Sequence, residues 1–188
     1  MINYRLIGIF IFFILFCRSS IVHGGMQFTQ GWWKAELTGG AGLDFTTIDR
    51  GGDILATIAA EYEFPASKRI TMGLRLIPLL MYKPEENDEE TLWGGGLGFA
   101  TRYYPLGSPY YGWYAALEGH GIVHEEKIRG NTSTFNFLIG SGIGYRFHNN
   151  WHGAVKFEHI SNGNLDTRNQ STNTISLAIG YTFSALKW

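Results

Sequence analysis

The sequence predicts an all-β fold, an eight-stranded antiparallel transmembrane β-barrel with a polar lumen. Apolar and polar residues alternate along segments of about 10 to 13 residues, and clusters of turn-forming residues separate these segments. The N-terminus in addition has the pattern of an export signal. Alternation with a period of two gives each strand one face for lipid and one face for the interior.

Composition narrows the class of protein. The chain has 188 residues, a formal net charge of −1 and 15% aromatic residues, so nothing favours a nucleic-acid partner. After the N-terminal segment, no stretch approaches the roughly 20 consecutive apolar residues of a membrane helix. Membrane crossing, if it occurs, must therefore use strands.

The first element is a predicted signal peptide, residues 1–24, which precedes a barrel formed by residues 25–188. Arg5 comes before an apolar run at residues 6–16 that is too short to span a bilayer, and small and polar residues follow it. Cys17, the single cysteine, lies in this segment, so the mature chain would contain no thiol. A lipoprotein cysteine at this position is the alternative, which the bulky Phe16 disfavours.

Eight segments then follow with one aliphatic or aromatic face and one face of Gly, Ser, Thr or charged residues. They cover residues 33–45, 54–64, 70–82, 92–103, 111–123, 134–147, 151–161 and 173–183. In the third segment Leu80 is assigned to the lipid face, opposite Arg75, and Pro78 predicts a bulge. The side chains expected in lipid include Trp33, Leu37, Ile58, Leu74, Phe137, Val155 and Leu177.

Charged residues on the polar faces are nearly balanced in sign, which suits a hydrogen-bonded ion network inside a narrow lumen. An eight-stranded barrel leaves room only for packed side chains, so these charges are interpreted as structural and no water-filled pore is expected. They are Lys34, Arg75, Arg102, Arg146 and Lys156, with Glu36, Asp44, Glu61, Glu63, Glu118 and Glu158.

Topology follows from the lengths of the links. Bacterial barrels have short periplasmic turns and longer external loops, which places the first, third, fifth and seventh links outside. These links span residues 47–53, 83–91, 124–133 and 162–172. The external end of the seventh strand is then where the chain carries His159 and Ser161.

His159 and Ser161 lie two positions apart and therefore share a face of that strand, continuing its apolar side. An imidazole next to a serine hydroxyl supplies the base that activates the nucleophile for acyl transfer. The turn that begins with Asn162 and Gly163 offers N–H groups for an oxyanion. This placement predicts an enzyme whose substrate is a lipid of the outer leaflet or a molecule that arrives from outside.

Residues 157–163, with the Asn-rich link and the last strand ending at residues 179–183, resemble the lipid A 3-O-deacylase family, the PagL-like outer-membrane acyl hydrolases. The resemblance implies an eight-stranded barrel in the bacterial outer membrane that removes an ester-linked acyl chain from the lipid A of lipopolysaccharide. It implies no cofactor, and it leaves the oligomeric state open, with a homodimer as one option.

By this resemblance Ser161 is the nucleophile, His159 the base, and Asn162 and Gly163 help to form the oxyanion hole. The family has a Glu at the start of the last strand as the third catalytic residue, and Asn173 stands there in this chain. An amide orients a histidine through its carbonyl oxygen but cannot stabilise an imidazolium by charge.

Two acidic residues could take the role of the missing Glu. Asp166 lies in the link before the last strand and could reach His159, whereas Glu158 points to the opposite face and is the poorer candidate.

No metal site is expected, because the remaining histidines lack metal-ligand spacing. The acidic run at residues 85–90 reads as a solvated loop, or alternatively as a place where a divalent cation bridges to phosphorylated lipid. A different class of function remains open: a non-enzymatic barrel that acts through its loops as an adhesin or envelope scaffold, with a pore as a weaker third option.

Overall fold

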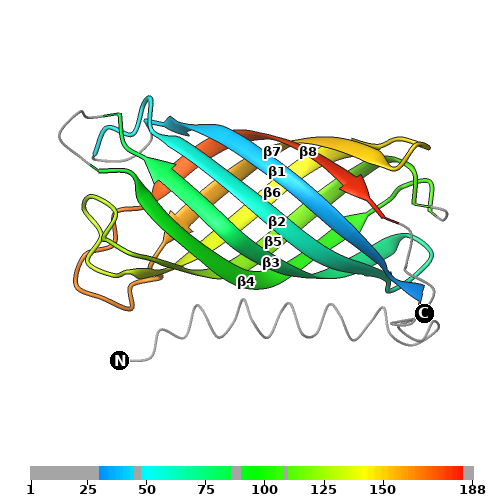
Figure 1. The fold of residues 1–188 in the computed structure, drawn as a ribbon, viewed down its shortest axis with the longest axis horizontal. Helices are drawn as coiled ribbons and strands as arrows, with labels where there is room; N and C mark the ends of the chain where they lie inside the picture. Colours follow the sequence, from blue (N-terminus) through cyan, green and yellow to red (C-terminus); the bar gives the residue numbers. More distant parts are fainter. Residues whose placement is uncertain (1–29, 45–47, 86–89, 108–109, 184–188) are drawn as a thin grey trace.

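A computed structural model describes residues 30–44, 48–85, 90–107 and 110–183, so the predicted signal peptide lies outside the described residues. The eight strands form a closed barrel in which each strand pairs with its neighbours in the chain (Figure 1). The predicted fold is confirmed, with strand ends within two residues of those expected. The strands are β1 (Trp32–Leu43), β2 (Ile54–Pro65), β3 (Ile70–Lys83), β4 (Leu92–Tyr103), β5 (Gly112–His124), β6 (Phe135–Arg146), β7 (Trp151–Ser161) and β8 (Thr172–Thr182).

Closure of the barrel depends on antiparallel pairing between β1 and β8, from Lys34 opposite Thr182 to Leu43 opposite Asn173. Backbone N–H and C=O groups find no water in a bilayer, so a sheet in lipid is stable only when its last strand pairs with its first. Among the residues that the structure describes, no helix is long and apolar enough to cross a membrane.

The two ends of the barrel differ. At one end, called here the terminal end, β1 begins and β8 finishes. The opposite end, the loop end, carries the links β1–β2, β3–β4, β5–β6 and β7–β8 and lies at the left of Figure 1. These are the links that the sequence places outside the membrane.

The outer wall is apolar. The side chains expected in lipid are exposed, apart from Phe137, which is partly buried. Aromatic pairs collect at the terminal end, where Trp113 lies 5.4 Å from Tyr145 and Trp151 lies 5.4 Å from Tyr181, measured between ring centroids. Such a belt is the usual anchor of a barrel at the membrane interface.

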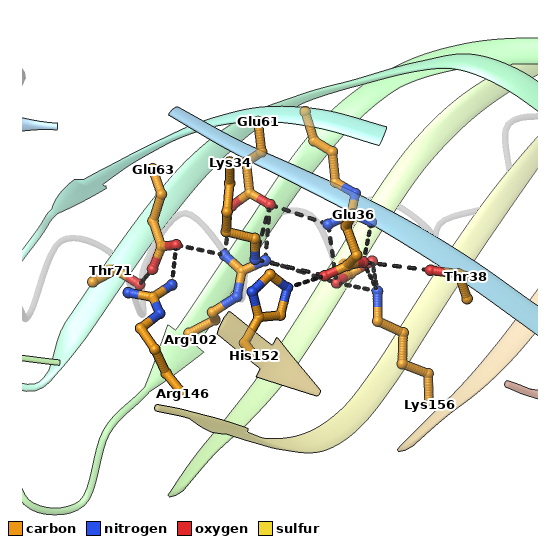
Figure 2. Close-up of polar contacts among 12 residues, drawn as sticks. Lys34, Glu36, Thr38, Glu61, Glu63, Thr71, Arg102, Arg146, His152 and Lys156 are labelled. Atoms are coloured by element: carbon orange, nitrogen blue, oxygen red, sulfur yellow. Dashed lines mark hydrogen bonds and ion pairs between the residues drawn. The ribbon is translucent and has the colours of Figure 1, made fainter. Parts of the chain in front are cut away.

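Buried ion pairs fill the lumen from the terminal end to its middle (Figure 2). Lys156 Nζ lies 2.6 Å from a carboxylate oxygen of Glu36 and 2.9 Å from one of Glu118. Glu61 accepts hydrogen bonds from both Arg75 and Arg102. Cross-strand pairing of this kind accounts for these charges as structural groups.

The lumen near the loop end departs from the expected polar interior. A buried apolar layer occupies it, formed by Leu55, Ala59, Ile77, Leu80, Tyr82, Leu92, Ile122, Ile128, Leu138 and Ile160. The alternation rule distinguishes two faces but does not show which positions along the inner face are apolar, so the sequence reading missed this layer.

Two assignments are corrected. Leu80 is buried inside the barrel and not in lipid, because the register shifts between Ile77 and Leu80 and both Pro78 and Leu79 are exposed there. The irregularity predicted from Pro78 is therefore real, and its effect is to reverse the face of Leu80. Asp44 follows the end of β1 and is exposed, so it takes no place in the lumen.

We expect Val155→Arg to destabilise the inserted barrel. Val155 lies in the middle of β7 with 53% of its surface exposed, and an arginine at the bilayer midplane costs about 2–4 kcal/mol. Guanidinium unfolding in lipid vesicles, followed by tryptophan fluorescence, measures the change. Leu165→Arg is the control, because Leu165 is exposed in the β7–β8 link; equal effects of the two substitutions would contradict the assignment of Val155 to lipid.

We also expect Glu61→Gln to destabilise the barrel by about 3–5 kcal/mol, since removal of one partner leaves Arg75 and Arg102 buried with too little negative charge. The same unfolding titration reports this loss. Glu126→Gln, at an exposed position of the β5–β6 link, should leave the midpoint unchanged. A midpoint that Glu61→Gln does not move would show that the network is dispensable.

Candidate functional site

A histidine–asparagine pair lies on the outer wall at the loop end. His159 of β7 stands opposite Asn173 of β8 in the sheet register. The Nδ1–H of His159 donates to Oδ1 of Asn173 at 2.8 Å. In the neutral imidazole this contact places the ring proton on Nδ1 and makes Nε2 the acceptor, the tautomer that a general base requires.

Ser161 is the last residue of β7 and lies two residues beyond His159 on the same face. It is partly buried, and its partner in the register with β6 is Phe137. The β7–β8 hairpin thus joins the imidazole of His159 to the amide of Asn173 and places Ser161 on the same face of an otherwise apolar wall. Among the described residues, no hydrogen bond joins the Ser161 hydroxyl to His159. His159 and Asn173 are partners of each other, whereas a lipid-facing hydroxyl without a partner is costly, so the Ser161 hydroxyl on this surface needs a chemical explanation.

Neither of the alternative acids contacts His159 in this arrangement. Asp166 is fully exposed, and its Oδ1 accepts a hydrogen bond from the N–H of Thr167 at 2.6 Å. That backbone N–H, together with the hydroxyls of Thr132 and Thr167, lowers the pKa of Asp166 below its usual value. Glu158 is buried in the lumen and accepts a hydrogen bond from Ser176. Asn173 alone occupies the position of an orienting residue.

Asn162 is fully buried and connects several parts of the loop end. Its Nδ2 donates to Oδ1 of Asn131 at 2.9 Å and to the carbonyl oxygen of Arg168 at 2.8 Å. Its backbone N–H donates to Oδ1 of Asn169 at 2.8 Å. The donors of Asn162 are therefore engaged within the protein, a role that no pattern in the sequence indicates.

Gly163 has a φ of +63°, a left-handed conformation that glycine adopts at little cost. A Cβ at this position would lie 3.2 Å from Cε2 of Phe137. The glycine therefore lets the chain turn closely over the Phe137 ring directly after Ser161. Among the described residues, the backbone N–H of Gly163 donates no hydrogen bond, unlike the N–H groups of Asn162 and Asn164.

The β5–β6 and β7–β8 links are joined to each other. Asn131 and Asn169 form an isolated antiparallel bridge, and the N–H of Gln170 donates to the carbonyl oxygen of Gly130 at 3.2 Å. The hydroxyl of Thr132 accepts from the N–H of Arg168 at 3.0 Å. The link that follows Ser161 is therefore held from the neighbouring link.

Across the described parts of the chain, no group of three His, Cys, Asp or Glu side chains lies in an arrangement that could hold a metal ion. The centre of the acidic run, residues 86–89, lies outside the described residues, and its flanking Glu85 and Glu90 are exposed.

Comparisons with known proteins identify a family for this chain and solved structures that share its fold. A family model described as lipid A 3-O-deacylase (PagL) matches residues 22–182. Three solved structures share the fold, each at low identity. They are the outer membrane enzyme PagL (13% identity, 79% of this chain and 98% of that one, TM-score 0.57), Neisserial surface protein A (12%, 85% and 100%, 0.52) and a de novo designed transmembrane β-barrel (13%, 81% and 96%, 0.50). No curated protein matches in sequence.

Gly163→Ala should loosen the β7–β8 link while the barrel stays folded. A left-handed alanine costs about 1–2 kcal/mol, and its methyl group would press against Phe137. Hydrogen exchange of residues 162–171, measured by mass spectrometry, should increase. Gly39→Ala is the matched control, because a Cβ there has no atom within 4 Å; faster exchange in both variants, or in neither, would contradict a tight turn at Gly163.

Proposed function

The chain belongs to the lipid A 3-O-deacylase (PagL) family, and we propose on this premise that it hydrolyses the 3-O acyl ester of lipid A by a Ser-His mechanism. As a member of this family with the outer-membrane barrel fold, it resides in the bacterial outer membrane. The observation that carries the proposal is the His159–Asn173 hydrogen bond of 2.8 Å on the outer wall, next to Ser161.

In the first half of the reaction, Ser161 Oγ attacks the acyl carbonyl carbon while His159 Nε2 takes the hydroxyl proton. The tetrahedral intermediate then collapses, and the sugar oxygen leaves with the proton that His159 returns. In the second half, His159 removes a proton from water, the water oxygen attacks the acyl-serine, and the fatty acid departs. Ser161 regains its proton from His159.

Negative charge develops on the carbonyl oxygen in both halves and needs aimed donors. We assign this role to the turn of Asn162 and Gly163. The N–H of Gly163 is the more direct donor, since the N–H of Asn162 already donates to Asn169. The N–H of Asn162 can donate to the oxyanion only if it first gives up its hydrogen bond to Asn169.

The location fits a lipid substrate. Outer-leaflet lipid surrounds the loop end of an outer-membrane barrel, and an acyl ester of lipid A lies at the boundary between sugar and hydrocarbon. His159 and Ser161 stand at that boundary, where β7 ends. A membrane lipid therefore reaches the serine by diffusion in the leaflet, without entering the lumen.

Asn173 replaces the carboxylate of the family, so the imidazolium that forms during catalysis lacks a neighbouring negative charge. Its Oδ1 still selects the productive ring tautomer. We therefore expect an active enzyme whose rate is below that of a carboxylate-containing member.

Mass spectrometry of lipid A from cells that express the protein tests the function. Wild type should remove one acyl chain, Ser161→Ala and His159→Ala should leave the pattern intact, and Asn173→Ala should act partially because it removes only the orienting group. Ser141→Ala, an exposed serine of β6, is the control and should behave as wild type. An unchanged lipid A with wild type would favour the adhesin or scaffold alternative, and removal that persists in Ser161→Ala would exclude the serine mechanism.

Asn173→Asp should raise kcat about tenfold. The change is isosteric, and a hydrogen bond to a charged acceptor contributes about 1 kcal/mol more than one to a neutral acceptor. Purified wild type and variant, assayed on lipid A in mixed micelles, give the comparison. A rate that falls would show that the carboxylate is not tolerated beside His159 and would remove Asn173 from the proposed orienting role.

A further inference from the structure

A chain of buried side chains runs from the turn after Ser161 to the end of β5. Asn162 Nδ2 donates to Asn131 Oδ1 at 2.9 Å, and Asn131 Nδ2 donates to Asn136 Oδ1 at 2.6 Å. Asn136 Nδ2 then donates to Nε2 of His124 at 2.6 Å. These four residues are between 0% and 5% exposed. If one hydrogen-bond partner in the series is lost, solvent therefore cannot replace it.

At the Asn162 end of this hydrogen-bonded series, backbone groups determine which side-chain atom donates and which accepts. The N–H of Asn164 donates to Asn162 Oδ1 at 2.9 Å, and Asn162 Nδ2 donates to the carbonyl oxygen of Arg168 at 2.8 Å. The amide of Asn162 therefore has a single permitted orientation, because a flip would place donor against donor and acceptor against acceptor.

The same holds at the inner end. The N–H of Ser133 donates to Asn131 Oδ1 at 3.1 Å, and Asn136 Nδ2 donates to the carbonyl oxygen of Ser133 at 3.2 Å. His124 Nδ1 contacts the carbonyl oxygen of Glu126, which makes Nδ1 the protonated nitrogen and Nε2 the acceptor. The chain thus has one polarity, set by the backbone of the β5–β6 and β7–β8 links.

We propose that Asn131, Asn136 and His124 are positioning residues for deacylation, which act through Asn162 on the backbone at Ser161 and Gly163. The inference rests on the proposed function. Loss of one member leaves a buried donor or acceptor unpaired, at a cost that the chain relieves most easily by moving the links, not the strands. The turn beside the serine is where that movement occurs.

A role limited to the stability of the barrel is a different expectation. The charge network and the apolar layer already fill the lumen, and these four residues lie beyond them at the loop end: His124, Asn136 and Asn162 are each two positions from Ile122, Leu138 and Ile160 of the layer. Asn131 and Asn162 belong to links and contact each other 31 residues apart, so their bond connects the two links directly. Displacement of the turn by about 1 Å is enough to reduce catalysis by about a hundredfold.

The test uses the full chain in detergent micelles with purified lipid A as substrate. Asn131→Ala should lower kcat by about tenfold to a hundredfold with KM within about twofold of wild type, because the contacts with substrate are untouched. His124→Leu should do the same. His124→Gln should keep kcat within about threefold of wild type, since its carbonyl oxygen can still accept from Asn136.

Equal losses in His124→Gln and His124→Leu would overturn the inference, as would a higher KM at unchanged kcat in Asn131→Ala. The paired His124 variants keep the test valid if Asn131→Ala fails to fold. Full activity of Asn131→Ala beside an active wild type would also reject the positioning role, while the proposed function would stand.

Hydrogen exchange separates failure of this inference from failure of the proposed function. Asn131→Ala should speed exchange of the amides of residues 161–165 about tenfold and leave β1–β4 unchanged. If exchange at residues 161–165 is unchanged in Asn131→Ala, the positioning role of these hydrogen-bonded residues is rejected, whatever the activity of the variant. If exchange at residues 161–165 is faster in Asn131→Ala but the wild type releases no acyl group from lipid A, the hydrogen-bonded residues do hold this turn and the proposed reaction is rejected.

Discussion

Pairing of β1 with β8 is the interaction on which the rest of this structure depends. Lipid offers no hydrogen bonds to the backbone, so an open edge at either strand would be untenable in the membrane. Once the sheet closes with eight strands, its interior is too narrow for bulk water. Every inward side chain must then find a partner inside, and every outward side chain must suit lipid.

These two requirements account for most of what the sequence could predict. Alternation predicted all eight strands, and the balance of charges predicted an ion network in the lumen, in which the structure pairs partners such as Lys156 and Glu36. Alternation could not predict the face of Leu80, because one bulge reverses the pattern after it. It also could not predict the apolar layer around Ile122, because an inward side chain needs a packing partner but not a polar one.

The same distinction applies to the candidate site. Strand periodicity and hairpin register are local rules, and they place His159 opposite Asn173 without knowledge of the fold. The bond between Asn131 and Asn162 depends on how two links fold over the barrel, and no periodic rule describes that packing. Contacts between irregular segments are therefore the part of the site for which the structure was needed.

The residues discussed for the chemistry all come from positions 124–173, whereas most carboxylates of the charge network belong to β1 and β2. The chain thus has one segment whose residues must preserve the geometry of the candidate site. In its other segment the side chains need only fill the lumen and balance its charge. Compensating substitutions can accumulate in the first strands as long as the lumen stays filled. The PagL structure has the same barrel fold at 13% identity over 79% of this chain, so one barrel fold can be built from very different sets of side chains.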